Sequence, residues 1–295
     1  MRIVSLLPSA TEMVYALGLG DQLVGVTHEC DFPPEAKGVR VVSRSALPQA
    51  ATPAEVDRLV SASVGDGEPI YRLDREAIRE LRPDLVLSQD LCAVCAVPSG
   101  HVNEALDLLG CRADVVSLDP SSLGEVLDGL RQVAEAAGVG GRADEVVAGL
   151  ERRLEAVRSA VAGLERPRVF ALEWSDPPFN GGHWVPEMIE AAGGTPVLAN
   201  AGASSVRVAW EDIVGAAPEV VVFMPCGYDL AAAVDEARRT LLGRAELPGG
   251  LVVVHADAYF SRPGPRLVDG VEALAAALHA GAVPEPPDGA FMRLR

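Results

Sequence analysis

Two cysteines separated by two residues, Cys92 and Cys95, have the spacing of a metal or redox motif. Thiolate sulfur and imidazole nitrogen are common donors to zinc and iron, so further cysteine and histidine side chains could complete a ligand set. The full candidate metal set is Cys92, Cys95, Cys30 and His28. No second Cys-x-x-Cys pair is present, and free cysteines often behave as ordinary buried apolar side chains. A zinc or iron site and a set of structural thiols therefore both remain open.

Only 4% of the residues are aromatic, and several of these follow candidate strands in the C-terminal half. Rigid aromatic side chains provide the apolar surface that a large flat ligand needs. The candidate ligand-binding residues of this half are Trp174, Phe179, His183, Trp184, Tyr228, Tyr259, Phe260 and Arg262. Pro8, Ser9 and His28 follow candidate strands of the N-terminal half and complete the set. The alternative is that some of the rings pack beneath their own loops.

His183 stands in the segment Asn180-Gly-Gly-His183-Trp184, whose glycines allow close backbone approach. An imidazole at this place could coordinate a metal centre or donate a hydrogen bond to a ligand. A solvated or structural histidine is the alternative interpretation.

Sequence motifs of the common enzyme classes are absent. The chain contains no Gly-x-x-x-x-Gly-Lys-[Ser/Thr], no Gly-x-Gly-x-x-Gly after the first strand, no His-Glu-x-x-His and no Gly-x-Ser-x-Gly. We therefore expect a binding protein and not an enzyme. The alternative is a metal-dependent or thiol-dependent enzyme that uses the cluster of Cys92, Cys95, Cys30 and His28.

Alternating apolar strands and helices predict the elements that position these loops. Candidate strands of the N-terminal half are Ile3–Leu7, Leu23–Val26, Val39–Val42, Leu85–Ser88 and Val115–Ser117. Those of the C-terminal half are Val169–Leu172, Val197–Leu198, Val220–Phe223 and Leu251–Val254. The pattern predicts an α/β fold with two Rossmann-like lobes, each with a mostly parallel sheet covered on both faces. Ligands of such sheets bind beyond the carboxyl ends of the strands, where the candidate residues stand.

An internal repeat supports two related lobes. Residues 76–86 recur at 211–221, an offset of 211 − 76 = 135, with matching Glu, Ile, Pro and apolar positions. Each copy predicts a short helix, a proline that stops it and a buried strand. A second match joins 3–18 to 169–193, where a strand, a loop and a helix end at a glycine.

The residues between the repeats predict helices. Ser122 and Glu125 form a candidate capping box, as Ser9 and Glu12 do at the first helix. Residues 142–162 predict one amphipathic helix with a single apolar stripe. We expect a helix-joined arrangement of three parts, an N-terminal α/β lobe 1–120, a linking helical segment 121–166 and a C-terminal α/β lobe 167–295.

The 295-residue chain has a formal net charge of −17 and no basic cluster, so nucleic-acid binding is not expected. No apolar run approaches the roughly 20 residues that cross a bilayer, so membrane insertion is not expected either. Five cysteines without framework spacing favour reduced thiols. No secretory signal pattern is found, which predicts a cytoplasmic location. The chain is expected to be a monomer. A periplasmic or other extracytoplasmic location is the alternative if a signal has been removed.

A family resemblance begins in the opening residues Val4-Ser-Leu-Leu-Pro-Ser-Ala-Thr-Glu12, followed by Leu17-Gly-Leu-Gly-Asp21 and Val24-Gly-Val26. They resemble the start of periplasmic cobalamin-binding proteins, helical-backbone substrate-binding proteins of ABC transporters whose relatives carry siderophores and heme. Residues 81–86 and 218–222 resemble the strand-leading motif of both lobes of that family. The resemblance covers essentially the whole chain. It implies two lobes bridged by one long helix, a ligand held between them and little hinge motion.

The ligand that the resemblance implies is a corrinoid, cobalamin or a related metal chelate, bound by a substrate-binding protein or by a cytoplasmic carrier. An anionic siderophore would need several arginines, and the few available are Arg44, Arg207 and Arg262, which favours a corrinoid. The resemblance also implies an ABC permease partner that docks on Glu76 and Glu211. Two ordinary surface carboxylates are the alternative. The cysteines and the missing signal resemble a cytoplasmic branch of the family.

Overall fold

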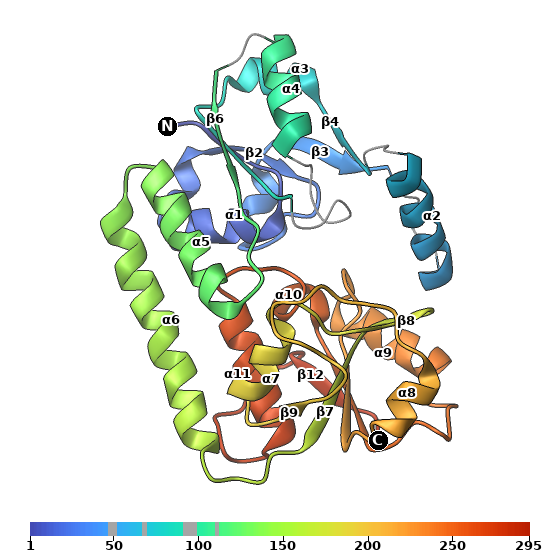
Figure 1. Cartoon of the computed structure of the whole chain (residues 1–295). Coiled ribbons are helices and arrows are strands. Elements are labelled where there is room, and N and C mark those ends of the chain that lie inside the picture. The colour runs from blue at the N-terminus through green and yellow to red at the C-terminus, as the bar shows by residue number, and fades with distance from the viewer. Residues whose placement is uncertain (47–51, 67–69, 91–98, 110–111) are drawn as a thin grey trace. The chain divides into compact units, whose positions relative to one another are not determined.

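The computed structural model describes residues 1–46, 52–66, 70–90, 99–109 and 112–295. Contacts divide the chain into two compact units, Met1–Pro120 with Val126–Ala148 and Ser121–Glu125 with Gly149–Arg295. Each unit contains its own six-stranded sheet with helices around it (Figure 1). The α/β prediction with two mostly parallel sheets is confirmed. The three changes of unit, after residues 120, 125 and 148, fall at the start of or inside the predicted linking segment 121–166, whose bounds stay a prediction.

The first sheet is parallel except at one edge. Its strands are β1 Ile3–Ser5, β2 Leu23–Thr27, β3 Val41–Ser45, β4 Tyr71–Leu73, β5 Leu85–Ser88 and β6 Asp114–Ser117. They lie in the order β4-β3-β2-β1-β5-β6, and β3 with β4 is the antiparallel pair. The central strand β1 is completely buried, which explains why it is continuously apolar apart from one serine.

Helices cover both faces of this sheet. The helices of the first half are α1 Pro8–Ala16, α2 Pro53–Asp66, α3 Arg75–Leu81, α4 Ser99–Leu109 and α5 Leu123–Ala136, with short 3-10 turns at Gly20–Gln22 and Pro34–Gly38. Side chains of α3 and α4 form one core cluster with Val4, Val42 and Val86 of the sheet. On α1, Met13 reaches Gly129 of α5, where a Cβ would lie only 3.3 Å from the methionine methyl carbon.

The second sheet is parallel at its centre, and its edge strands β8 and β12 are antiparallel to their neighbours. Its strands are β7 Arg168–Ser175, β8 Pro178–Asn180, β9 Thr195–Pro196, β10 Val220–Phe223, β11 Gly250–Val254 and β12 Phe291–Arg293. They lie in the order β12-β11-β10-β7-β8, and β9 also pairs with β7. The predicted strand Val197–Leu198 is wrong, because pairing ends two residues earlier and Leu198 has a φ of 55°, which no strand residue adopts.

Helices pack on both faces of the second sheet as well. They are α6 Gly140–Val161, α7 Val185–Ala191, α8 Trp210–Gly215, α9 Leu230–Thr240, α10 Ala256–Tyr259 and α11 Leu267–Leu278. Side chains of α8 and α9 pack on the face that carries Phe170, Phe223 and Val253. On the opposite face α7 contacts α11. The predicted covering of both faces follows from strands that are apolar on each side.

The internal repeat is visible in the backbone. Helix α3, a proline and β5 in the first unit match α8, a proline and β10 in the second. Arg82 and Ala217 stand immediately before the two prolines, 217 − 82 = 135 residues apart, and both have a φ of 44°. Left-handed backbone at residues other than glycine is uncommon. Its recurrence at the offset predicted from the sequence therefore confirms that the two segments have the same local structure.

The two predicted capping boxes differ in outcome. At α5, Ser122 Oγ accepts from the Glu125 backbone N–H at 3.1 Å, and Glu125 accepts in turn from the N–H of Ser121 at 2.6 Å. At α1 the prediction is wrong. The helix begins at Pro8 with Leu7 as N-cap, so Ser9 lies inside the first turn and makes no capping bond.

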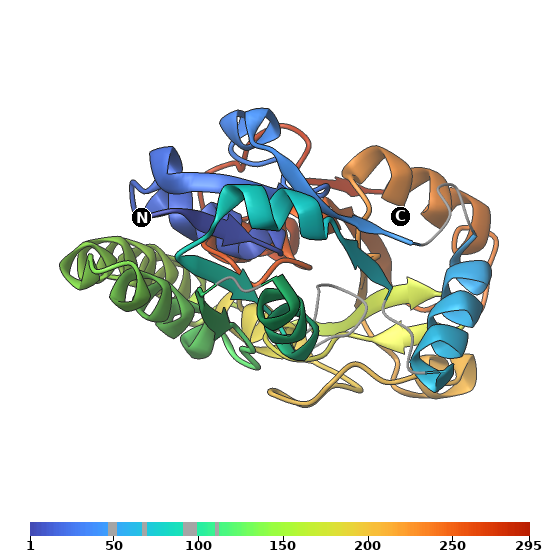
Figure 2. The same cartoon turned by 90° about the horizontal axis from the view of Figure 1, so that it is seen from above.

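The predicted long helix is α6, of 22 residues, which continues from the first unit into the second. The first half of α6 lies beside α5 (Figures 1 and 2). Its second half is tied to α11, because the Arg153 guanidinium donates to Glu272 at 2.6 and 2.9 Å and also pairs with Asp269. No helix in the described ranges is both long enough and apolar enough to cross a membrane.

Candidate functional site

The carboxyl ends of the strands in the second sheet carry most of the predicted ligand-binding residues. Strand β7 is flanked by β10 on one side and by β8 on the other. Its last residues, the turn after β10 and the turn after β11 all emerge at this edge. Open α/β sheets bind ligands at such an edge, since the loops there diverge and leave space between them.

Three half-buried rings stand at this edge and are here called the aromatic row: Trp174 of β7, Phe179 of β8 and Tyr228 after β10. Trp174 pairs with Phe179 across the β7–β8 ladder. The ring centroids of Trp174 and Tyr228 lie 6.0 Å apart at 88°, an edge-to-face contact. The structure thus brings Tyr228, which is distant in the sequence, beside the β7–β8 hairpin.

A buried carboxylate lies near Tyr228 of the aromatic row. Glu236 of α9 is 5% exposed, accepts from Ser175 Oγ at 3.1 Å and pairs with Arg239. Burial, and the negative charge of Glu236 nearby, raise the pKa of the Tyr228 phenol. Tyr228 therefore stays a neutral hydroxyl that can donate a hydrogen bond.

The turn after β11 continues this edge. The Asp257 N–H donates to the Tyr228 carbonyl at 3.0 Å, which links the turn to the aromatic row. Arg262 is 8% exposed and donates to both carboxylate oxygens of Asp257, at 2.6 and 3.1 Å. Tyr259 is half-buried, with its ring 5.6 Å from that of His255. The predicted cation Arg262 is thus committed to an ion pair.

Two predicted contacts lie in the interior. Trp184 is 6% and Phe260 is 2% exposed, and the Trp184 indole N–H donates to the Phe260 carbonyl at 2.8 Å. Side chains so enclosed offer a ligand little surface, so packing is the role that their geometry gives them. Contact with a ligand is therefore expected from the half-buried rings.

His183 is half-buried beside Trp184. Its backbone has a φ of 51° and its ring centroid lies 5.5 Å from the indole at 32°. The backbone N–H donates to the Ala203 carbonyl at 2.6 Å. Burial lowers the pKa of the imidazole, which favours the neutral ring.

The predicted ligand-binding residues of the first unit differ in how far they are exposed. Pro8 is half-buried at the start of α1, Ser9 is 2% exposed, and His28 is exposed after β2. The His28 ring lies 6.2 Å from that of Tyr71, whose hydroxyl donates to Glu29 at 2.9 Å. Tyr71 was missed in the sequence because β4, which carries it, is too short to show alternation.

The predicted metal set is only partly within the described residues. Cys92 and Cys95 lie outside them, so the complete set stays a prediction. Cys30 is buried, with its sulfur 3.0 Å from Thr11 Oγ1, while His28 is exposed. Among the residues that the structure describes, no three His, Cys, Asp or Glu side chains are grouped so that they could hold a metal ion.

The predicted docking residues occupy equivalent places. Glu76 is the second residue of α3, and Glu211 is the second residue of α8. Both are exposed, Glu76 with 75% of its side-chain surface. Both carboxylates stand at helix N-termini, where negative charge is favourable, so each also has a purely structural reason to be present.

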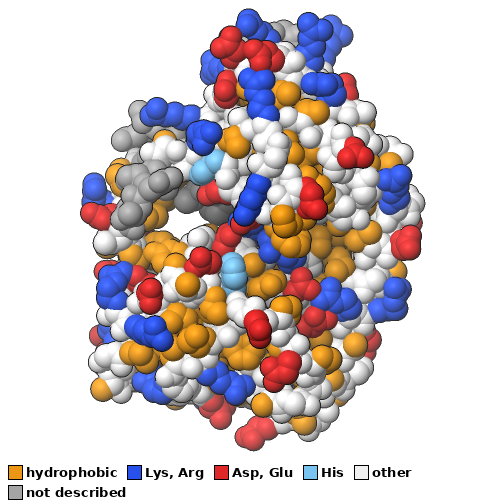
Figure 3. Space-filling view, turned by 180° about the vertical axis from the view of Figure 1, so that it is seen from behind, with side chains coloured by type: hydrophobic (Ala, Val, Ile, Leu, Met, Phe, Trp, Pro, Cys, Tyr) orange, Lys and Arg blue, Asp and Glu red, His pale blue; other side chains and the backbone are white. Residues whose placement is uncertain are grey.

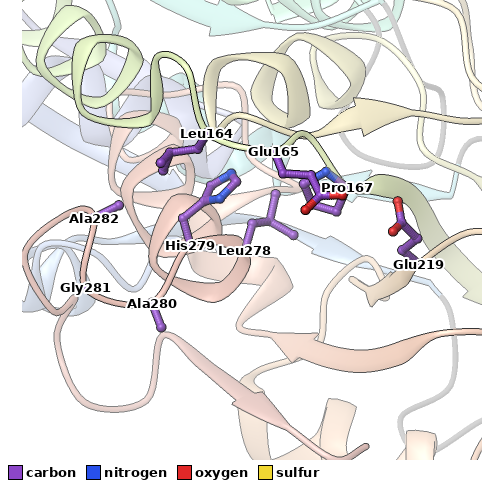
Figure 4. A pocket seen from close by; sticks show the side chains of 9 residues that line it. All are labelled: Leu164, Glu165, Pro167, Glu219, Leu278, His279, Ala280, Gly281 and Ala282. Atoms are coloured by element: carbon purple, nitrogen blue, oxygen red, sulfur yellow. The ribbon is translucent and has the colours of Figure 1, made fainter.

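Two pockets open elsewhere in the second unit. One, of about 570 Å³, is lined by Leu164, Glu165, Pro167, Glu219, Leu278, His279, Ala280, Gly281 and Ala282. Figure 4 shows the end of α11 beside the segment that leads into β7. The other, of about 640 Å³, lies along the end of α6 and the outer side of α7. None of the predicted ligand-binding residues lines either pocket, and the first lies at the amino ends of the strands.

Known proteins resemble the chain over nearly its whole length. A vitamin B12-binding protein of Vibrio cholerae is 25% identical over 279 residues, covering 92% of this chain and 86% of the relative. An uncharacterized ABC transporter substrate-binding lipoprotein of Bacillus subtilis is 27% identical over 296 residues, covering 94% and 80%.

Solved structures share the fold. The periplasmic vitamin B12 binding protein BtuF of Vibrio cholerae superposes with a TM-score of 0.67 at 24% identity, covering 94% of this chain and 96% of that one. A periplasmic heme binding protein of Pseudomonas aeruginosa gives 0.72 at 22%, covering 99% and 97%. The sequence model of the periplasmic binding protein family matches residues 3–241. The chain therefore belongs to the periplasmic binding protein family, whose members bind solutes and are not enzymes.

Proposed function

We propose that the chain is the substrate-binding protein of an ABC transporter and that its cargo is a metal-chelating macrocycle, a corrinoid such as cobalamin in the first place. The aromatic row of Trp174, Phe179 and Tyr228 is the observation that carries this proposal. Relatives that bind vitamin B12 or heme support it, because both ligands are large, flat and apolar on their faces.

The aromatic row suits such a ligand for a physical reason. Each ring is half-buried, so one part is fixed by the sheet and another part remains exposed. A macrocycle that covers these exposed parts removes apolar surface from water without the cost of ordering flexible side chains. The Tyr228 hydroxyl adds one directed hydrogen bond to the rim of a ligand.

The charges near the aromatic row favour a corrinoid over an anionic chelate. A carboxylate-rich ligand would compete with Asp257 for the buried Arg262. The uncharged amide side chains of a corrinoid do not require the ion pair between Asp257 and Arg262 to break. On the face shown in Figure 3, Lys and Arg side chains are interspersed with Asp and Glu.

The proposed partner is a membrane permease that docks on Glu76 and Glu211, and the equivalent positions of the two glutamates in the repeat support it. Relatives described as periplasmic or as a lipoprotein favour delivery from outside the cytoplasmic membrane. We infer an extracytoplasmic location, and a cytoplasmic carrier is the alternative. Cell fractionation with an antibody decides between the two locations.

Paired tryptophan variants test the place of the ligand. Trp174→Leu is expected to weaken binding of cyanocobalamin or hemin by about tenfold or more, because a lost aromatic contact exceeds about 1.4 kcal/mol. Trp210→Phe is the matched control, since this ring is half-buried against the Arg244 guanidinium at 4.0 Å. Equilibrium dialysis measures both affinities. Equal affinities in the two variants would place the ligand elsewhere.

A further inference from the structure

His183 is held in a backbone conformation that its residue type disfavours. Its φ of 51° lies in the left-handed region, which glycine adopts freely and a histidine rarely adopts. Two hydrogen bonds fix it there, from its own N–H to Ala203 at 2.6 Å and from the Gly202 N–H to its carbonyl at 3.0 Å. Non-glycine residues in such conformations are concentrated at ligand-binding sites, because the surrounding structure must maintain them.

The imidazole of His183 is also fixed in direction. It lies against the Trp184 indole, and that indole is anchored by its hydrogen bond to the Phe260 carbonyl. The ring is half-buried, so one part packs on tryptophan and another part is accessible. The backbone and the stacking contact therefore orient the ring with no help from its own nitrogens.

Each of the other half-buried histidines has a hydrogen-bond partner at one ring nitrogen. His255 Nδ1 accepts from the Ala258 N–H at 3.2 Å, and His279 Nε2 lies 3.2 Å from the Gly193 carbonyl oxygen. In the described ranges, the His183 ring forms no hydrogen bond to another residue. An oriented, neutral and unengaged imidazole is the form that binds a transition metal.

We propose that His183 is an axial ligand to the metal of the bound macrocycle, an inference that rests on the proposed function. One ring nitrogen donates its lone pair to cobalt(III) or iron(III), and the water that occupied that axial position leaves as neutral water. The oxidation state of the metal does not change. The same loop that positions the ring, at Gly182 and Ser205, is tied to the sheet by the Glu173 carboxylate.

His183→Gly is the informative variant. Glycine accepts a φ of 51° and keeps both backbone hydrogen bonds, so the loop is expected to retain its shape without the imidazole. His255→Asn is the matched control, because asparagine preserves an acceptor for the Ala258 N–H while it removes another half-buried histidine. Thermal melts establish that both variants fold.

The probes differ in whether an axial position is open. Aquacobalamin and hemin can exchange a bound water, whereas cyanocobalamin has both axial positions filled and metal-free protoporphyrin has no metal. The unmodified protein and His255→Asn are expected to shift the absorbance bands of aquacobalamin or hemin. His183→Gly is expected to lose this band shift and to regain it when imidazole is added. It is also expected to bind aquacobalamin or hemin at least about tenfold more weakly, because even residues that contact a metal only through its ligands contribute tenfold or more to affinity. The affinity of His183→Gly for cyanocobalamin or for metal-free protoporphyrin, which offer no open axial position, should stay within about twofold of that of the unmodified protein.

The outcomes separate the two proposals. A band shift that persists in His183→Gly, or equal losses of affinity for open and closed probes, overturns axial ligation and leaves the proposed function in place. Binding of the probes by the unmodified protein without any band shift does the same. If the unmodified protein binds no macrocycle of either pair, both the proposed function and the axial role are rejected.

Discussion

His255, at the residue scale, uses one ring nitrogen as a helix cap. Its Nδ1 accepts from the Ala258 N–H, which requires that this nitrogen carry no proton. Burial is the largest cause that lowers the pKa of the imidazole below its usual value of 6.5. The nearby charges are Asp257 and Asp229, which raise the pKa, and Arg266 and Arg262, which lower it.

The lowered pKa of His255 gives the folding stability a defined pH dependence. The folded state binds the proton more weakly than the unfolded chain, so the stabilisation is complete above about pH 6.5 and is lost as the pH falls. We expect the free energy of unfolding to decrease less between pH 7 and pH 5 in His255→Asn than in the unmodified protein. Urea denaturation at both pH values measures this, and equal decreases would contradict it.

Burial also limits how well the ligand-contact role of a single residue can be predicted from the sequence. Trp184 and Phe260 have the same residue types as Trp174 and Phe179 and also follow predicted strands, yet they face the interior. Whether a ring points inward depends on contacts between elements far apart in the chain, and no local pattern records these contacts. The position of the loops could therefore be predicted from the strands, but the direction of each ring could not.

Helix α9 links stability to the candidate site at the scale of elements. Its N-cap, Asp229, accepts from the Ala232 N–H at 2.8 Å, and the helix carries the buried Glu236 near Tyr228. A capping carboxylate satisfies a backbone donor that the helix itself leaves unbonded and complements the positive end of the helix dipole. The start of α9 thus helps to position the carboxylate near the aromatic row.

Asp229→Ala is expected to lower the free energy of unfolding by about 1 kcal/mol, because the Ala232 N–H loses its acceptor. Asp235→Ala on the same helix is the control, since its side chain is 79% exposed and its ion pair with Arg238 is a surface pair. Urea denaturation compares the two. The capping argument would be wrong if both variants were equally stable.

The elements themselves were largely predictable, and the exceptions have physical causes. The long apolar strands and the repeat follow from periodicity, and Arg82 and Ala217 show that the match extends to single backbone conformations. The edge strands β4, β8 and β12 have three residues each and show too little alternation to be recognised. The capping box at Ser9 failed because the helix begins at Pro8, with Leu7 as N-cap, two residues earlier than that box requires.

At the scale of the whole molecule, the proposed docking on a permease involves both units, because Glu76 lies in the first unit and Glu211 in the second. Both carboxylates are exposed, and neither is among the predicted ligand-binding residues, so docking and ligand binding can be tested separately. Glu76→Ala with Glu211→Ala is expected to abolish ligand uptake by cells that depend on this transporter and to leave ligand affinity unchanged. The measurements are radiolabelled uptake and equilibrium dialysis.

Controls for docking stand on the same two helices. Glu80→Gln on α3 and Asp212→Asn on α8 also remove one exposed negative charge each. Uptake is expected to continue in this control pair. If it fell as far as in the Glu76 and Glu211 pair, the effect would be one of net charge and the docking assignment would be rejected.

The most direct test of the central claim is calorimetric titration of the unmodified protein with cyanocobalamin, hemin and a ferric siderophore in parallel. The account predicts saturable one-to-one binding of a macrocycle, strongest for cyanocobalamin, with a negative heat-capacity change from buried apolar surface. Heat from the siderophore alone, with neither macrocycle bound, would contradict it.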